Sequence, residues 1–301
     1  MRFRESGQLD TSSIQDRRGG GAGRGLAVGG GGLGLVGVIV VILVQVLGGG
    51  GDASNVAGVL AGLGNGQTAD NTELRQSCQN VADANTSTEC AVAADIDSIQ
   101  EYWGQQLGAR YTPVDTVFFS GSTQTACGGA TSGSGPFYCP GDHLVYIDLS
   151  FFDDLQTQFG AEGGAFVNAY VLAHEYGHHV QDLLGTNQRV TPGETGPTSG
   201  SVRLELQADC YAGTWADHAE TVPDASGQPL ITDITADDIS RALDTAGRIG
   251  DDYIQQNLGG GTVDQKSFTH GSSEQRQRWF STGYSSGNPN ACDTFGTDDL
   301  G

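Results

Sequence analysis

The amino-acid sequence predicts an α+β fold, mainly helical with a small sheet, that is preceded by one membrane-spanning helix. Several long segments place apolar residues at helical spacing, whereas only two short segments have the composition of β-strands. An uncharged apolar run, residues 26–47, stands before all of them. Long helices beside a few strands are typical of the α+β class.

The uncharged run 26–47 has the length of a membrane span. A helix of this length extends about 33 Å, against about 30 Å for the hydrocarbon core of a bilayer. Arginines precede the run, and no basic residue follows it until Arg75. The positive-inside rule therefore predicts a cytoplasmic N-terminal tail, 1–25, and a C-terminal part outside the cell membrane. A cleaved signal peptide is the alternative, but the polar stretch before the run does not favour it.

After the predicted anchor, residues 48–72 are rich in Gly and Ala and are expected to form a flexible linker. The folded domain is then expected to comprise residues 73–301. The chain carries 36 acidic and 14 basic side chains, a formal charge of -22. Because nucleic acids are bound by clusters of Lys and Arg, this charge argues against a nucleic-acid partner.

Within the domain, the first helix is expected at 95–108, where apolar residues recur on one face and Gly108 ends the pattern. Strands are expected at 114–120 and 143–150, on either side of a loop rich in Gly and Ser. If the second strand lies at a sheet edge, it can pair with an extended peptide. The remaining helices are expected at 151–160, 161–184, 201–219, 235–257 and 272–283.

The six cysteines are an even number, which is typical of a disulfide framework in an exported domain. Six free thiols in a reducing compartment are the alternative, and the predicted export argues against it. Sequence alone does not fix the pairing. Proximity along the chain favours Cys78–Cys90, Cys127–Cys139 and Cys210–Cys292.

The helix expected at 161–184 contains the sequence AHEYGHH. His174 and His178 are four residues apart, so their side chains lie one turn apart on the same helix face. Two imidazoles in this relation can both bind one zinc ion. Glu175 projects beside them and can accept a proton from a zinc-activated water. The pattern predicts a catalytic site with one Zn²⁺ per chain and Glu175 as the general base.

A catalytic zinc ion takes three protein ligands and leaves a fourth position for water. Glu205 and Asp209 stand four residues apart on the next predicted helix. Glu205 is the candidate third ligand. Asp209 can accept the free ring N–H of a zinc-bound histidine and so fix its tautomer. The alternative is that both are solvated charges on a helix face.

The other histidines lack the spacing of metal ligands. His179 points about 100° away from His178 on the helix, so it is expected to pack or to contact substrate. His218 is expected at the surface, and no partner is predicted for His143.

His270 lies beside a glycine just before the last predicted helix, a position typical of a cleft edge. Hydrolysis of an amide builds negative charge on the carbonyl oxygen, and a donor aimed there lowers the barrier. His270, Arg276 and Tyr211 are the candidates for this role. Capping and salt-bridging of the last helix are the alternative.

Several segments resemble the bacterial neutral zinc metallopeptidase family, a group within the zincin class. They are YCPGDHLVYIDLSFF, AYVLAHEYGHHVQDLLG, RLELQADCYAGTWA and FTHGSSEQRQRWF. The pair HExxH and ExxAD is similar to that of gluzincin peptidases. The resemblance implies a zincin-like domain with His174, His178 and Glu205 as zinc ligands and Glu175 as catalytic base. It also implies a place near the cleft for His270, although Gly271 stands where related peptidases have proline.

The expected function is that of a membrane-anchored zinc metallopeptidase, with a peptide or protein as its substrate. Two other classes stay open. One is a zinc hydrolase of non-peptide amide bonds such as those of a cell wall. The other is an inactive, zinc-stabilised interaction protein, against which the intact Glu175 argues, because a structural zinc site needs no base.

Overall fold

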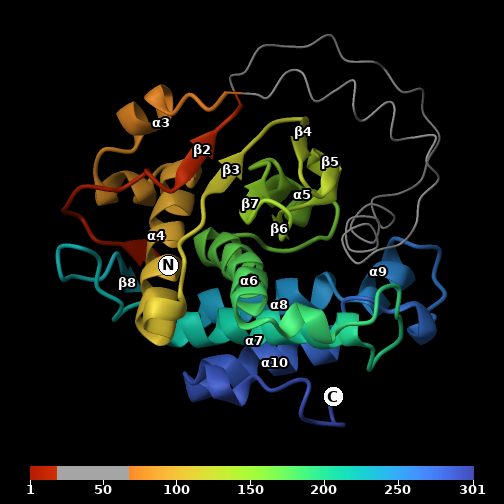
Figure 1. Ribbon diagram of the computed structural model, residues 1–301. Coiled ribbons are helices and arrows are strands. Elements are labelled where there is room, and N and C mark those ends of the chain that lie inside the picture. Colours follow the sequence, from red (N-terminus) through yellow and green to blue (C-terminus); the bar gives the residue numbers. More distant parts are fainter. Residues whose placement is uncertain (19–67) are drawn as a thin grey trace.

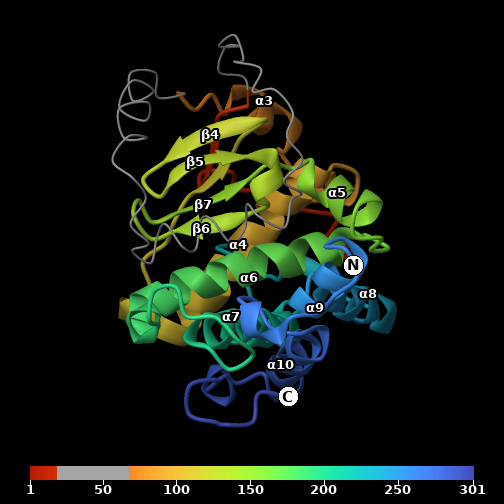
Figure 2. The same cartoon turned by 90° about the vertical axis from the view of Figure 1, so that its right-hand side faces the viewer.

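A small sheet lies above a stack of long helices in the computed structural model, which describes residues 1–18 and 68–301. Figure 2 shows the layers in order: the hairpin β4–β5, the sheet, and then helices α6, α7 and α10. This arrangement confirms the predicted α+β class.

The four-stranded sheet has the strand order β2–β3–β7–β6. Strands β2 (Ile14–Asp16), β3 (Thr116–Phe118) and β7 (Leu144–Ile147) are parallel, and β6 (Phe137–Cys139) is antiparallel to β7. The predicted strand at 143–150 therefore lies inside the sheet and has a partner on each side. This strand is therefore not at a sheet edge, so the condition for its pairing with a peptide is not met. Among the described residues, β6 is the outer strand on the side of the helices.

The loop expected between the two predicted strands holds most of the remaining sheet structure. It contains the hairpin β4 (Ser122–Thr125) and β5 (Gly128–Thr131), as well as β6. The disulfide Cys127–Cys139 ties the tip of the hairpin to β6. Sequence pattern missed the hairpin because its segment is rich in Gly, which has low β-propensity, and it missed β6 because three residues are too few to show alternation.

Helix α6 (Ala165–Leu184) runs through the core beneath the sheet, and most of its side chains are buried. It ends at Gly185, whose left-handed conformation (φ 72°) allows the chain to turn away. Helix α7 (Gly200–His218) begins where the Ser199 side chain accepts a hydrogen bond from the N–H of Val202. Helix α10 (Ser273–Ser286) packs along α7.

Helices α7 and α10 approach each other through two glycines. A methyl group on Gly283 would overlap the carbonyl oxygen of Cys210, and one on Gly213 would overlap that of Phe280. The two backbones are therefore in direct contact. The disulfide Cys210–Cys292 fastens the chain after α10 to the same turn of α7.

Two other predicted helices have different bounds. Helix α4 (Thr88–Leu107) begins a full two turns before the predicted start, because Ser87 caps it. The single helix expected at 235–257 is broken into α8 (Ala236–Arg248) and α9 (Asp251–Asn257). At the break, Gly250 lies so close to Ser273 that no side chain fits there. The short helices α3 (Thr72–Ser77) and α5 (Phe151–Thr157) complete the set of α-helices in the described residues.

Residues 1–18 belong to the folded unit rather than to a separate tail. Strand β1 (Arg2–Phe3) pairs with β8 (Ile231–Asp233), and β2 is part of the main sheet. The guanidinium of Arg4 is buried and lies 2.6 Å from the Asp224 carboxylate. The expected domain start at residue 73 therefore leaves out a part of the fold.

The predicted membrane span 26–47 and nearly all of the predicted linker 48–72 lie outside the described residues. In the parts of the chain that are described, no helix has the length and apolar character needed to cross a membrane. The N–H of Asp70 donates to the carbonyl of Asp16 (2.8 Å), so both ends of the region between them lie side by side.

All six cysteines form disulfides: Cys78–Cys90, Cys127–Cys139 and Cys210–Cys292. The pairing expected from proximity along the chain is confirmed.

Candidate metal centre

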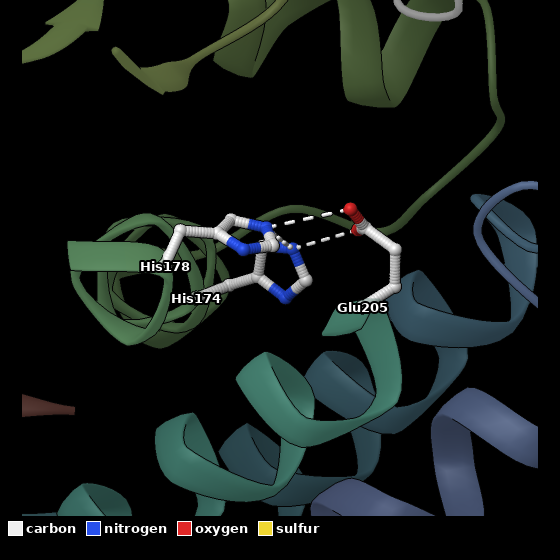
Figure 3. A group of neighbouring side chains, drawn as sticks. All are labelled: His174, His178 and Glu205. Atoms are coloured by element: carbon white, nitrogen blue, oxygen red, sulfur yellow. Dashed lines mark hydrogen bonds and ion pairs between the residues drawn. The ribbon is translucent and has the colours of Figure 1, made fainter. Parts of the chain in front are cut away.

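Helices α6 and α7 bring His174, His178 and Glu205 together. The Nε2 atoms of the two histidines are 3.2 Å apart. Nε2 of His174 lies 3.2 Å from Oε2 of Glu205, and Nε2 of His178 lies 3.5 Å from Oε1. Figure 3 shows both rings projecting from one helix toward the carboxylate on the other. Of the residues that the structure describes, these three form a group with the spacing of metal ligands.

The three groups fit a zinc ion. Ligands at about 2.0–2.1 Å in a tetrahedron lie roughly 3.3 Å from one another, close to the observed separations. Two imidazoles and one carboxylate are a set typical of catalytic zinc sites, which keep a fourth position open. The three side chains border a cleft of about 810 Å³, so the open position faces space for a substrate.

The outer nitrogen of each ring has a hydrogen-bond acceptor. Nδ1 of His174 lies 2.8 Å from Oδ1 of Asp209, and Nδ1 of His178 lies 2.9 Å from Oε1 of Gln181. A proton held at Nδ1 leaves the lone pair of Nε2 free for a metal. Asp209 therefore lies where the sequence predicted. Gln181 was missed, although its spacing of three residues from His178 on one helix was a usable signal.

Asp209 is the centre of a buried network. Besides His174, it accepts hydrogen bonds from the hydroxyl of Tyr170 (2.7 Å) and from two nitrogens of Arg276 (2.8 and 3.0 Å). Burial raises the pKa of Asp209, but the charges of Arg276 and His174 lower it further, to about 2. The carboxylate stays ionised and holds three cationic or donating groups in place.

Two of the three candidates for oxyanion stabilisation make other contacts, although Arg276 also lines the cleft. The guanidinium of Arg276 is bound by Asp209 in a two-point contact, so it supports His174 through that carboxylate. Tyr211 packs edge-on against Trp103 in the core and lies apart from the residues that line the cleft.

The electrostatics of the centre favour a positive charge. In the metal-free protein, burial lowers the pKa of His174, but the carboxylates of Asp209 and Glu205 raise it, with a net value of about 10. Burial also raises the pKa of Glu205, yet the two histidines lower it well below its usual range. The same carboxylates, Asp209 and Glu205, would attract a divalent cation bound in place of the proton.

Glu175 lies in the cleft beside these groups. Its Oε2 accepts a hydrogen bond from the backbone N–H of Tyr138 in β6 (3.1 Å). The side chain is buried, and burial raises the pKa of the carboxyl above its usual value. A raised pKa suits a group that takes up a proton and releases it again.

His270 also lines the cleft, and Asp251 holds it there. Oδ2 of Asp251 accepts the N–H groups of Thr269, His270 and Gly271, at 2.7 to 3.0 Å. Oδ1 lies 3.3 Å from Nδ1 of His270. Burial lowers the pKa of His270, but the Asp251 and Glu205 carboxylates produce a net rise. Asp251 was missed because no spacing in the sequence links it to a residue nineteen positions away.

The comparisons with known proteins agree with this geometry. A family model described as "Putative neutral zinc metallopeptidase" matches residues 1–295. The chain belongs to this family. It is 48% identical to "Uncharacterized protein Rv2575" of Mycobacterium tuberculosis over 225 residues, 74% of this chain and 76% of the relative. It is 40% identical to "Uncharacterized protein YpfJ" of Escherichia coli K12 over 245 residues, 79% of this chain and 80% of the relative. No solved structure matches it significantly.

In this member of the neutral zinc metallopeptidase family, the remaining histidines lie off the metal centre. The ring of His179 is buried, with Nε2 2.8 Å from the carbonyl oxygen of Thr112. His218 is partly exposed at the end of α7, with Nδ1 near the carbonyl oxygen of Thr214. His143 does have partners that the sequence did not predict. Its Nδ1 lies 3.0 Å from the hydroxyl of Tyr138 and 3.1 Å from Asp182.

Proposed function

We propose that this protein is a zinc-dependent peptidase in which Glu175 is the general base. One observation carries the proposal. Glu175 lies beside a three-ligand metal centre that opens into a large cleft. A structural zinc site closes with four protein ligands and needs no base, so this arrangement supports turnover.

The chain's own residues divide the work as follows. His174, His178 and Glu205 would hold a zinc ion, which when bound polarises a carbonyl group and acidifies water. Glu175 has one oxygen, Oε2, bonded to the Tyr138 N–H, so Oε1 is available to take a proton from the attacking water. The same carboxyl then delivers the proton to the leaving amine.

His270 is the candidate donor to the carbonyl oxygen as negative charge develops on it. Asp251 orients the ring through Nδ1, which leaves Nε2 as the nitrogen that can face the substrate. We expect His270→Ala to lower kcat by about 10²- to 10³-fold while zinc binding stays unchanged. His218→Ala is the matched control, because His218 lies on α7 but outside the cleft. Equal effects of both substitutions would remove His270 from the mechanism.

The cleft also suggests how a peptide would lie. Its walls include the outer strand β6 on one side, and several apolar side chains elsewhere. The apolar residues are Phe137, Phe151, Phe159, Val171, Ile249 and Ile254. An extended peptide would lie along β6 and these apolar side chains. Peptide bonds next to large apolar side chains are therefore the substrates to offer first.

The disulfides support a location outside the cytoplasm, where such bonds persist. We propose an extracytoplasmic catalytic domain and keep membrane attachment through 26–47 as part of that proposal. A single crossing there would separate β1 and β2 from the strands with which they pair. Reporter tags at both ends of the full chain would test this proposal, which expects both tags outside the cytoplasm.

The test of the proposed activity compares wild type with Glu175→Gln. The full chain would be produced in an oxidising compartment, then assayed for bound zinc and for cleavage of a proteome-derived peptide library. We expect about one zinc per chain in both proteins, and a loss of cleavage of about 10⁴-fold or more in the variant, since base removal is among the costliest substitutions. Zinc without cleavage in either protein would favour an inactive scaffold, or a non-peptide amide, for which purified cell-wall material is the next substrate. A folded protein without zinc would refute the proposal.

A further inference from the structure

The hydroxyl of Tyr138 is the meeting point of a second network, next to the metal centre. It donates to Oδ2 of Asp182 (2.9 Å), near the end of α6. Nδ1 of His143 lies 3.0 Å from the hydroxyl oxygen, and Nδ1 of His179 lies 3.3 Å from it. Three polar side chains therefore surround one phenol at the border between β6 and α6.

The hydrogen-bond roles in this network are set by its outer contacts. Nε2 of His179 faces the carbonyl oxygen of Thr112, so Nε2 carries the proton and Nδ1 does not. The single phenol proton of Tyr138 goes to Asp182, so the approach of Nδ1 of His179 to the phenol oxygen is a packing contact. Nδ1 of His143 faces both the phenol oxygen and Asp182, so its proton can serve either. His143 has φ 56°, a left-handed conformation unusual for a residue with a side chain, and the turn holds the ring at this position.

The backbone of the same residue holds Glu175. Tyr138 is opposite Val145 in the β6–β7 ladder, and its N–H points away from β7 toward Oε2 of Glu175. Tyr138 is thus attached to α6 twice, once through its N–H at Glu175 and once through its hydroxyl at Asp182. The anchors on α6 are seven residues apart, about 10 Å along the helix.

We propose that Tyr138 is a positioning residue for Glu175, and that Asp182 acts through it. The hydroxyl contacts fix β6 against α6, and the N–H of the fixed strand engages one oxygen of the carboxylate. The other oxygen is then left as the proton acceptor. The last histidine of AHEYGHH, His179, packs its ring against that of Tyr138 on the side away from the metal ligands. The inference depends on the proposed peptidase activity.

Tyr138→Phe removes the hydroxyl but keeps the ring and the backbone N–H. We expect kcat to fall by about 10- to 100-fold, because small displacements of a catalytic group have effects of this size, while KM and zinc content stay the same. His179→Gln should be milder than His179→Ala, because glutamine can still donate to the Thr112 carbonyl. Tyr146→Phe is the matched control. Tyr146 is a buried tyrosine of the neighbouring strand β7, and its hydroxyl donates to the carboxylate of Asp142 (2.8 Å).

A double-mutant cycle separates positioning from general stability. If Tyr138 acts through Glu175, then Tyr138→Phe should slow the wild type but leave the residual rate of Glu175→Gln within about twofold, since coupled residues are not additive. A loss by the same factor in both backgrounds would overturn the inference, and so would equal losses in Tyr138→Phe and Tyr146→Phe.

Amide hydrogen exchange on the metal-free protein supplies a readout that needs no turnover. The amide of residue 138 should exchange about tenfold faster or more in Tyr138→Phe and not in Tyr146→Phe, because its contact with Glu175 is loosened. Unchanged exchange would count against the inference even if activity fell. A wild type that binds zinc, shows the protected amide and cleaves no peptide would instead refute the peptidase proposal on which the catalytic role depends.

Discussion

Asp209 connects the candidate metal ligand His174 to the rest of the core. It is fully buried and has an ion pair with Arg276, a contact with His174 and a hydrogen bond from Tyr170. Burying a charge is costly unless it is paired. Here each partner of Asp209 removes part of that cost, and His174 gains its orientation from the same contact.

Asp209→Asn should therefore affect both metal binding and stability. We expect zinc affinity to fall by about 10- to 100-fold, since the outer partner of a ligand histidine is lost. The free energy of unfolding should drop by about 3–5 kcal/mol, because Arg276 keeps its charge in the core without a counter-ion. Competition with a chelator and denaturant unfolding measure the two effects. Asp217→Asn, on the more exposed end of α7, is the control. Wild-type zinc affinity in Asp209→Asn would contradict this account.

Among single residues, the sequence predicted those site residues that lie near each other on the same helix. His174 with His178, and Glu205 with Asp209, are each four residues apart, so one turn of helix places them. The partners that come from elsewhere in the chain were not predictable. Tyr138 reaches Glu175 across 37 positions, and Arg276 reaches Asp209 across 67. Only the packing of separate elements decides such contacts.

At the scale of elements, the contact of α7 with α10 determines how the second half of the site is held. Helix α7 carries Glu205 and Asp209, and α10 carries Arg276. Gly213 and Gly283 let the two backbones touch. The side chain of Arg276 on α10 can therefore contact Asp209 on α7. The helix spacing and the ion pair therefore depend on each other.

Gly283→Ala should push these helices apart. We expect a loss of about 1–3 kcal/mol in the free energy of unfolding, as for other overpacked cores, and weaker zinc binding. Gly104→Ala is the control, because a methyl group there meets only the edge of Tyr111 at an ordinary 3.9 Å. That substitution should instead stabilise α4 by about 0.5–1 kcal/mol through helix propensity. Thermal unfolding of both variants measures these changes in stability. A Gly283→Ala variant as stable as the wild type would contradict the close packing of α7 and α10.

Long helices were predictable, whereas among the short strands of the main sheet only β3 and β7, which lie in apolar runs, were predicted. Helices α6, α7 and α10 have 20, 19 and 14 residues, and their bounds lie within a few residues of those predicted. Strands β1, β2 and β6 have two or three residues each. No periodic pattern can be read in so few positions, and their pairing is set by partners far along the chain.

At the scale of the whole molecule, the first eighteen residues pack against elements from the middle and the second half of the chain. They pair with β3 and β8, and Arg4 reaches Asp224 and the carbonyls of Gln228 and Pro229. These contacts join the start of the chain to the segment between α7 and α8.

Acid should weaken this attachment. Burial raises the pKa of Asp224, but hydrogen bonds from Arg4 and Ser226 lower it further, to about 2. Because the folded pKa is below the ordinary value of 3.8, the contact stabilises the fold above about pH 4 and is lost as the pH falls toward 2. Hydrogen exchange of residues 1–18 at pH 5 and pH 2.5 measures this. In Asp224→Asn, the same residues should exchange faster at pH 5 and change less with pH. Equal pH dependence in both proteins would exclude Asp224 as the cause.

The pairing of β1 with β8 also imposes an order on biosynthesis. Phe3 has its partner in Ile231, so 228 positions separate the two. At typical rates of about 5–20 residues per second, a ribosome needs roughly 10 to 45 s to make that interval. During this time β1 has no strand to join, and α10, which follows β8, has yet to reach Asp209. The molecule can therefore close only when almost the whole chain has been made. A product truncated before α10 would contain every zinc ligand but not the cation that balances Asp209.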